Sequence, residues 1–253
     1  MKRLVITLMC VLISTLLFAA EYDAPMQLYK PNYFIAGGPE DQVKFQISAK
    51  YNLIYPSDLG FWIAYTQRSF WALYDKSSPF RETNYEPEFF WRGEAGKNLP
   101  YLGPIDYIQL SPIFHRSNGR DGLESRGMNT YYGEVQLSIG EVVCTGVVLK
   151  AFGYYNISRR NRDLPDYLGY YEGEAFIQLK SATVPLLQKE RLYIRGGGNY
   201  KTEKGWLEGG FRVRLITSVF QPYLYIQVFH GYGESMIEYN KKDTAVRVGI
   251  MIE

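Results

Sequence analysis

Apolar and polar residues alternate with a period of two along much of the chain. The clearest stretch is 43–53, where every odd-numbered residue is apolar and every even-numbered residue is polar. The stretches 207–215 and 246–252 behave in the same way. Because successive side chains of a β-strand point to opposite faces of the sheet, this alternation predicts strands that each have one apolar and one polar face.

Segments with strand signals recur along the chain and number twelve. They are expected at 29–37, 42–54, 59–73, 84–96, 104–117, 128–140, 142–155, 167–181, 190–202, 205–217, 220–231 and 244–252. An even number of antiparallel strands of about ten residues is typical of an outer-membrane β-barrel. The predicted fold is therefore all-β, a 12-stranded antiparallel transmembrane β-barrel. The alternative is a secreted soluble β-sandwich or closed barrel, in which the apolar faces would form the core.

Two features favour the membrane over the soluble alternative. Aromatic residues gather near the predicted strand ends, as in the aromatic girdles of membrane barrels. They are Tyr131, Tyr132, Tyr154, Tyr155, Tyr170, Tyr171, Trp62, Trp91 and Trp206. The polar faces carry charges of both signs, which could pair inside a plugged barrel rather than line a selective pore. They are Glu172, Glu174, Lys180, Arg195, Glu208, Arg212, Arg214 and Arg247.

The first twenty residues have the pattern of a secretory signal peptide. Two basic residues precede an apolar run from Leu4 to Leu17, and small residues follow at Ala19 and Ala20. The run is shorter than the ~20 residues that a membrane-anchoring helix needs. Residues 1–20 are therefore predicted to be removed, leaving 21–253 as a single barrel domain. That domain has equal numbers of acidic and basic residues, so its charge gives no reason to expect nucleic acid as a partner.

The candidate chemistry lies in the segment FHRSNGRDGLESRGMN, which begins at Phe114. His115 and Ser117 are two residues apart, so on a strand they face the same way and can form a base and nucleophile pair. A turn-like stretch separates them from Asn129, which could then lie on the next strand and orient the imidazole. The His-x-Ser pair alone also fits a surface histidine beside a loop serine.

A proline lies within the strand that carries this pair. Pro112 has no backbone donor, and a closed barrel has no edge strand, so a bulge is expected near Ser111 and Pro112. The bulge shifts the alternation by one residue. His115 and Ser117 would then face the lipid.

Four segments resemble the outer-membrane phospholipase A family, and they occur in the same order and with matching spacing. They are SSPFRETNYEPEFF (Ser77–Phe90), HRSNGRDGLESRGMN (His115–Asn129), YLGYYEG (Tyr167–Gly173) and HGYGESMIEYN (His230–Asn240). The resemblance implies calcium-dependent hydrolysis of acyl ester bonds in phospholipids and lysophospholipids. It also implies a homodimer in the bacterial outer membrane, with the active site on the barrel wall toward the outer leaflet.

The same resemblance implies roles for individual residues. Ser117 would be the nucleophile, His115 the base and Asn129 its orienting partner. The backbone amide of Gly119, together with a calcium-bound water, would form the oxyanion hole.

For the metal and the dimer, the resemblance implies four further residues. Calcium would be held by the Arg120 carbonyl, the Ser125 hydroxyl and, from the other protomer, the Ser77 carbonyl. Gln67 would form a hydrogen bond across the dimer interface. Gly122 stands where family members can carry an aspartate for a second calcium site, which puts that second site in doubt. A passive channel or surface adhesin with the same fold is the alternative function.

Overall fold

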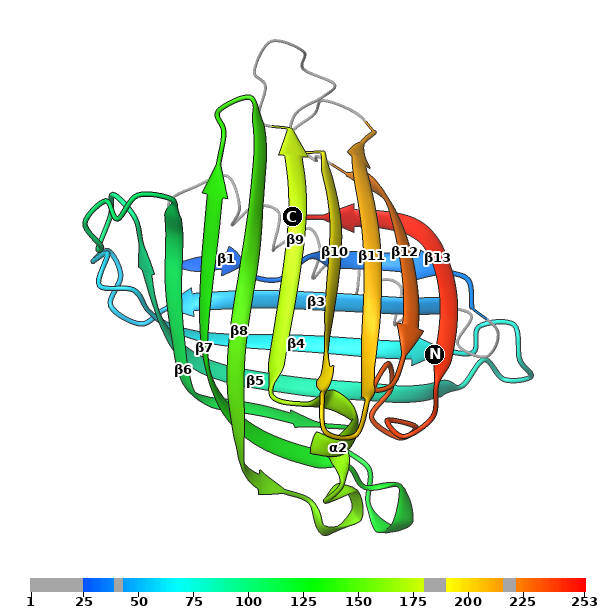
Figure 1. Ribbon diagram of the computed structural model, residues 1–253. Helices are drawn as coiled ribbons and strands as arrows, with labels where there is room; N and C mark the ends of the chain where they lie inside the picture. Colours follow the sequence, from blue (N-terminus) through cyan, green and yellow to red (C-terminus); the bar gives the residue numbers. More distant parts are fainter. Residues whose placement is uncertain (1–24, 39–42, 180–189, 216–221) are drawn as a thin grey trace.

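The chain forms a closed β-barrel. The structure is a computed structural model that describes residues 25–38, 43–179, 190–215 and 222–253. Twelve strands, β2 to β13, follow one another around the barrel in antiparallel pairs, and β13 pairs with β2 to close it (Figure 1). The predicted all-β, 12-stranded antiparallel barrel is confirmed. The predicted signal peptide lies outside the described residues and stays a prediction.

The elements follow the predicted segments closely. The first strands are β1 Met26–Leu28, β2 Asn32–Ala36, β3 Val43–Asn52, β4 Phe61–Trp71, β5 Phe80–Glu94, β6 Ile105–Ser117 and β7 Gly127–Ile139. They are followed by β8 Val143–Ile157, β9 Tyr171–Leu179, β10 Arg191–Asn199, β11 Lys204–Arg214, β12 Tyr223–Gly231 and β13 Asp243–Ile252. Three short helices, η1 Gly122–Glu124, η2 Arg159–Asn161 and α2 Leu164–Leu168, lie in the connections.

The first predicted strand, 29–37, begins only at Asn32 in the structure, and a short strand, β1, precedes it. Strands β1 and β2 both pair with β3, but residues 29–31 between them do not. Pro31 has no N–H to donate to a ladder. The Tyr29 hydroxyl accepts a hydrogen bond from Gln109 on β6 at 2.8 Å, across the barrel interior. The break therefore places a side chain inside the barrel.

Polar residues lie inside the barrel and apolar residues outside it. Lys44, Ser48 and Asn52 of β3 are buried, whereas Ile63 and Leu110 on the wall are 46% and 51% exposed. A soluble sandwich would bury its apolar faces and expose its polar ones. The inverted arrangement is that of a barrel whose wall faces lipid.

Ion pairs fill much of the interior. Arg195 Nη2 lies 2.8 Å from Glu208 Oε1, and Lys44 Nζ and Arg247 Nη1 both lie 2.8 Å from Glu234 Oε1. The interior cavity that remains has a volume of about 460 Å³. The predicted pairing of opposite charges is thus present, although Lys180, one of the predicted members, lies outside the described residues.

Two predictions about the wall need correction. Tyr131 is 54% exposed on the outer face, but Tyr132 and Trp62 are buried and point inward. Adjacent residues of a strand alternate between faces, so two consecutive tyrosines cannot both belong to a girdle. The strand predicted at 167–181 starts only at Tyr171, because residues 164–168 form α2. Within the described parts of the chain, no helix is long and apolar enough to cross a membrane.

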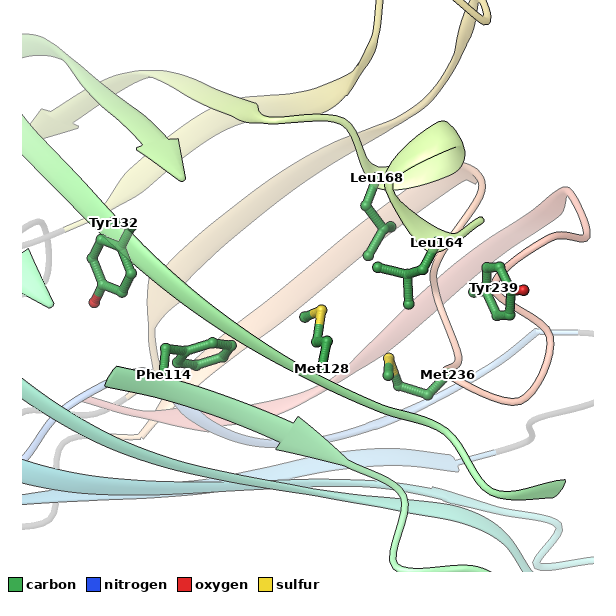
Figure 2. Close-up of a cluster of buried hydrophobic side chains, with 7 residues drawn as sticks. All are labelled: Phe114, Met128, Tyr132, Leu164, Leu168, Met236 and Tyr239. Carbon is green, nitrogen blue, oxygen red and sulfur yellow. The ribbon is translucent and has the colours of Figure 1, made fainter. Parts of the chain in front are cut away.

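An apolar cluster closes one end of the barrel. Figure 1 shows α2 and the loop between β12 and β13 at this end. Leu164 and Leu168 of α2 meet Met236 and Tyr239 of that loop (Figure 2). The same cluster contains Phe114 of β6, together with Met128 and Tyr132 of β7. The inner faces of the strands that carry the candidate site are therefore packed against a cap.

Candidate active site

A bulge in β6 turns His115 and Ser117 outward. The pairing of β6 with β7 shifts register between Ser111 and Phe114, as predicted from the proline between them. Beyond the shift Phe114 is 5% exposed and packs inside the barrel. His115 and Ser117 have the opposite phase to Phe114, so they lie on the outer wall.

His115 is joined to Asn129 on the neighbouring strand. The two residues are directly paired in the β6–β7 ladder, and His115 Nδ1 lies 2.8 Å from Asn129 Oδ1. The Asn129 side-chain nitrogen donates to the Asn156 carbonyl at 3.4 Å, which turns the amide oxygen toward the imidazole. An acceptor at Nδ1 selects the tautomer with the proton on that atom, so Nε2 is left free to accept a proton.

Ser117 lies two residues beyond His115 on the same face of β6. The sequence predicts a hydrogen bond between the serine hydroxyl and the imidazole, but the Ser117 hydroxyl makes none among the described residues. Hydrogen bonds of this kind are often long until a substrate is bound. The structure therefore puts the predicted nucleophile and the predicted base on one face without a hydrogen bond between them.

Between these two residues, Arg116 points into the barrel. Its Nε lies 2.8 Å from Oε1 of Glu86 on β5, a carboxylate that is 1% exposed. Lys30 and Arg68 approach the same carboxylate at 3.7 and 3.9 Å. The strand that carries the candidate site is thus anchored from its inner side.

Gly119 occupies a position that only glycine fits. Its φ of +63° lies in the left-handed region, and a Cβ there would come within 2.6 Å of the Tyr85 ring. Tyr85 itself pairs with Ser117 in the β5–β6 ladder. The tight turn therefore brings the Gly119 backbone close to the predicted nucleophile, which is where an oxyanion donor is needed.

Asn118 organises the loop that follows, and sequence reasoning did not single it out. Its side chain is 3% exposed and donates to the Glu124 carbonyl at 2.7 Å. Its Oδ1 accepts from the backbone amides of Arg126 at 3.0 Å and Arg120 at 3.3 Å. Asparagine at the start of a turn commonly bonds the backbone two residues on, which was the available signal.

The predicted calcium ligands lie on two connections at the same end of the barrel. Arg120 and Ser125 belong to the 118–126 loop, and Ser77 lies in the β4–β5 turn with a φ of +70°. The Arg120 guanidinium donates to the Arg81 carbonyl at the start of β5, next to that turn. The described residues contain no group of three His, Cys, Asp or Glu residues suited to a metal.

The predicted ligand atoms are instead hydroxyl and carbonyl oxygens, which calcium accepts. The Ser125 hydroxyl makes no hydrogen bond among the described residues, so it is free to bind an ion. One loop supplies two ligands, fewer than the six to eight that calcium takes, so water or further oxygen ligands would have to complete the set. The donor chemistry is compatible with calcium.

Gln67 lies on the outer face of β4. It accepts a hydrogen bond from the Tyr65 hydroxyl at 3.1 Å and donates to Ser69 Oγ at 3.4 Å. Its amide thus has two hydrogen-bond partners within one chain. An amide has a second donor and a second lone pair, so capacity remains for a partner chain.

Outside the site, burial and a hydrogen bond to Asp163 raise the pKa of Tyr239 in the β12–β13 loop. This tyrosine is therefore neutral, and its hydroxyl donates a hydrogen bond to the Asp163 carboxylate.

Comparison with known proteins gives matches along most of the chain. The model of the Phospholipase A1 family matches residues 14–252. A relative from Neisseria meningitidis serogroup B is 31% identical over 217 residues, which are 83% of this chain and 54% of the relative. The chain therefore spans about half the length of that relative. The Phospholipase A1 of Escherichia coli K12 is 34% identical over 219 residues, which are 84% of this chain and 70% of that protein.

Solved structures agree with these matches. The outer membrane phospholipase A of Escherichia coli has a TM-score of 0.76 at 29% identity, over 95% of this chain and 96% of that one. The outer membrane phospholipase dimer of Salmonella typhi with bound calcium has a TM-score of 0.75 at 28% identity, over 90% and 92%. The barrel described above is accordingly an outer-membrane barrel, and the chain belongs to the Phospholipase A1 family.

Proposed function

We propose that this chain is a calcium-dependent phospholipase that hydrolyses acyl ester bonds of phospholipids and lysophospholipids. Its Ser-His-Asn site would lie on the lipid-facing wall toward the outer leaflet, and the active form would be a homodimer. The observation that carries the proposal is the 2.8 Å contact between His115 Nδ1 and Asn129 Oδ1 on the outer wall, with Ser117 on the same face. Polar side chains that face lipid are costly, so a chemical role explains their presence there.

In the proposed reaction, the Ser117 hydroxyl attacks the ester carbonyl while His115 Nε2 takes its proton. The C–O bond to glycerol then breaks, and the imidazole returns the proton to the departing glycerol oxygen. Water repeats the sequence on the acyl-serine and frees the fatty acid. Asn129 is neutral, so it orients the imidazole but stabilises the imidazolium less than an aspartate would.

The negative charge on the tetrahedral oxygen needs donors where it develops. The Gly119 amide is proposed as one of them. Arg120 and Ser125 would hold calcium through a carbonyl and a hydroxyl oxygen, with Ser77 of the partner subunit supplying a further carbonyl. Calcium would supply positive charge to a bound water that donates to the same oxygen. The dimer with bound calcium known for the Salmonella typhi protein supports this assignment.

The outer wall also offers space for an acyl chain. A groove of about 620 Å³ lies beside the β6 bulge, on the strand that carries Ser117. Its lining consists of Phe61, Phe89, Trp91, Leu110, Ser111, Pro112, Tyr131 and Tyr132. An apolar groove on the same outer wall as Ser117 suits a lipid substrate better than a water-soluble ester.

The alternative is a passive channel or adhesin with the same fold. A channel has no use for a histidine and asparagine pair that faces lipid, and the barrel interior is crossed by ion pairs. We therefore retain the enzyme proposal.

Acyl release from phospholipid vesicles by the purified barrel tests the proposal. We expect Ser117→Ala to reduce turnover by roughly 10⁵-fold or more while the barrel stays folded. Ser138→Ala on the neighbouring strand β7 is the matched control and should keep full activity. Equal acyl release by Ser117→Ala and wild type would reject Ser117 as the nucleophile, and no acyl release by the folded wild-type barrel would reject the enzyme in favour of the channel or adhesin.

A further inference from the structure

The loop that carries Ser125 is held by contacts with the capped end of the barrel as well as by its own hydrogen bonds. Arg126, the residue after Ser125, makes contacts of both kinds. Its Nη1 donates to the Leu123 carbonyl at 2.9 Å and to the Ser125 carbonyl at 3.0 Å. One guanidinium thus fixes the backbone on both sides of the short 124–125 stretch.

The other side of the same guanidinium faces the β12–β13 loop. Arg126 Nη2 approaches the Ile237 carbonyl at 3.5 Å, a long hydrogen bond, and its Cζ lies 5.9 Å from the centre of the Tyr239 ring. A guanidinium over an aromatic face is attracted by the ring electrons. Arg126 therefore spans the gap between the two loops.

The β12–β13 loop is itself firmly seated. Both carboxylate oxygens of Glu82 on β5 accept from the Met236 amide at 2.9 Å, and one of them also accepts from the Ile237 amide at 3.1 Å. Glu234 is paired with Lys44 and Arg247 at its base, at 2.8 Å each. The surface that Arg126 touches is thus rigid.

A third contact closes the set. Arg120 of the 118–126 loop donates to the Arg81 carbonyl on β5, and the Arg81 guanidinium lies 3.4 Å from Glu238 of the β12–β13 loop. Each of three segments therefore contacts the other two: the 118–126 loop, the start of β5 and the β12–β13 loop. Each of the three segments limits the movement of the other two.

We propose that Arg126 is a positioning residue for calcium, which sets the Ser125 ligand by tying its loop to the β12–β13 loop at the capped end. This inference rests on the calcium site of the proposed function and adds a residue to it. Arg126 does not touch calcium or substrate. Its removal should weaken calcium binding without changing the chemistry once calcium saturates the site.

Calcium binding to the purified barrel, measured by isothermal titration calorimetry in a Ser117→Ala background, tests this inference without any need for turnover. We expect Arg126→Ala to raise the dissociation constant for calcium about tenfold, the effect of losing one charge-assisted hydrogen bond. Arg126→Lys keeps the positive charge but not the paired donors of the guanidinium, so it should recover only part of the lost calcium affinity. Arg160→Ala, at an exposed arginine in the β8–β9 connection, is the matched control and should bind as the parent does.

A second variant guards against misfolding of Arg126→Ala. Tyr239→Leu removes the aromatic platform from the other loop and should weaken calcium binding about threefold. In the background with Ser117 intact, kcat at saturating calcium should be unchanged in both variants. Parental calcium affinity in folded Arg126→Ala or Tyr239→Leu, or a barrel that binds no calcium at all, would overturn the inference. The activity of Ser117→Ala is measured separately, so failure of the nucleophile assignment can be distinguished from failure of this inference.

Discussion

Polar residues on the two faces of β6 differ in the number of polar partners that surround them. On the inner face, Arg116 meets Glu86, and Lys30 and Arg68 surround the same carboxylate. On the outer face, His115 has Asn129 as its one polar partner among the described residues. Inside, polar groups satisfy one another and stabilise the barrel. Outside, where lipid offers no hydrogen bonds, polar groups are kept at a cost, and we infer that they are kept for chemistry.

Removal of calcium should have the largest effect on the outer face and almost none on the inner one. With excess chelator we expect turnover to fall about 10²- to 10³-fold, the effect of losing one oxyanion donor. Dimers should dissociate as well, since binding at a shared site favours the associated state. Acyl release and crosslinking, each followed by calcium re-addition, would measure both effects. Unchanged turnover in excess chelator would show that hydrolysis does not require calcium.

Asn129 offers a sharper test of the outer face. Asn129→Ala leaves His115 Nδ1 without its acceptor, and we expect turnover to fall about 100-fold. Asn129→Asp presents only acceptors and always selects the useful tautomer, so it should stay within about tenfold of wild type at alkaline pH, where the carboxyl group is ionised. Turnover across pH at saturating calcium compares the two. If the turnover of Asn129→Ala equals that of Asn129→Asp at every pH, Asn129 does not orient His115.

Glu86→Gln tests the inner face. It removes the buried negative charge that three half-buried cations share, and we expect the free energy of unfolding to fall by about 2 kcal/mol, near the value of one hydrogen bond to a charged group. Denaturant unfolding in detergent gives that difference. The folded variant should still hydrolyse lipid, because Glu86 lies on the side of the wall away from Ser117. A stable but inactive variant would mean that the two faces are not separable.

The smallest effect is expected at Gln67. Replacing it by leucine removes its hydrogen bonds to Tyr65 and Ser69 and the one proposed across the dimer interface. We expect the dissociation constant of the dimer to rise about fivefold, near the value of one neutral hydrogen bond. Sedimentation in detergent would measure the change. Gln136→Leu, an inner-face control whose amide donates to Asp106 at 3.0 Å, should leave the dimer unaffected. A similar rise in the dissociation constant for both variants would mean that Gln67 acts through the stability of the barrel rather than through the dimer interface.

The barrel and the outward site could be predicted because both depend on local periodicity. Alternation located the strands, and Pro112 located the bulge that reverses the phase of β6. The helix α2 was missed because Leu164 and Leu168 are buried in a cluster whose other members, on β6, β7 and the β12–β13 loop, are distant in sequence. The break before β2 was missed because Tyr29 finds its partner, Gln109, across the interior.

The parts of the site that depend on loop packing could not be predicted in the same way. His115 and Asn129 were matched through strand geometry, a short-range argument that the ladder register supports. Asn118 bonds three backbone groups whose positions the loop conformation sets. Arg126 contacts residues more than a hundred positions away. No pattern within the 118–126 segment encodes such partners.

The most direct test of the central claim is to identify which residue acts as the nucleophile. A long-chain lipid phosphonate, a general reagent for serine hydrolases, would be incubated with the barrel in vesicles with calcium, and the modified peptide would be identified by mass spectrometry. We predict modification of Ser117 alone, dependent on His115 and lost in Ser117→Ala. Modification of a different serine, or of Ser117 at the same rate in His115→Ala, would contradict the claim that the outer face of β6 carries the chemistry.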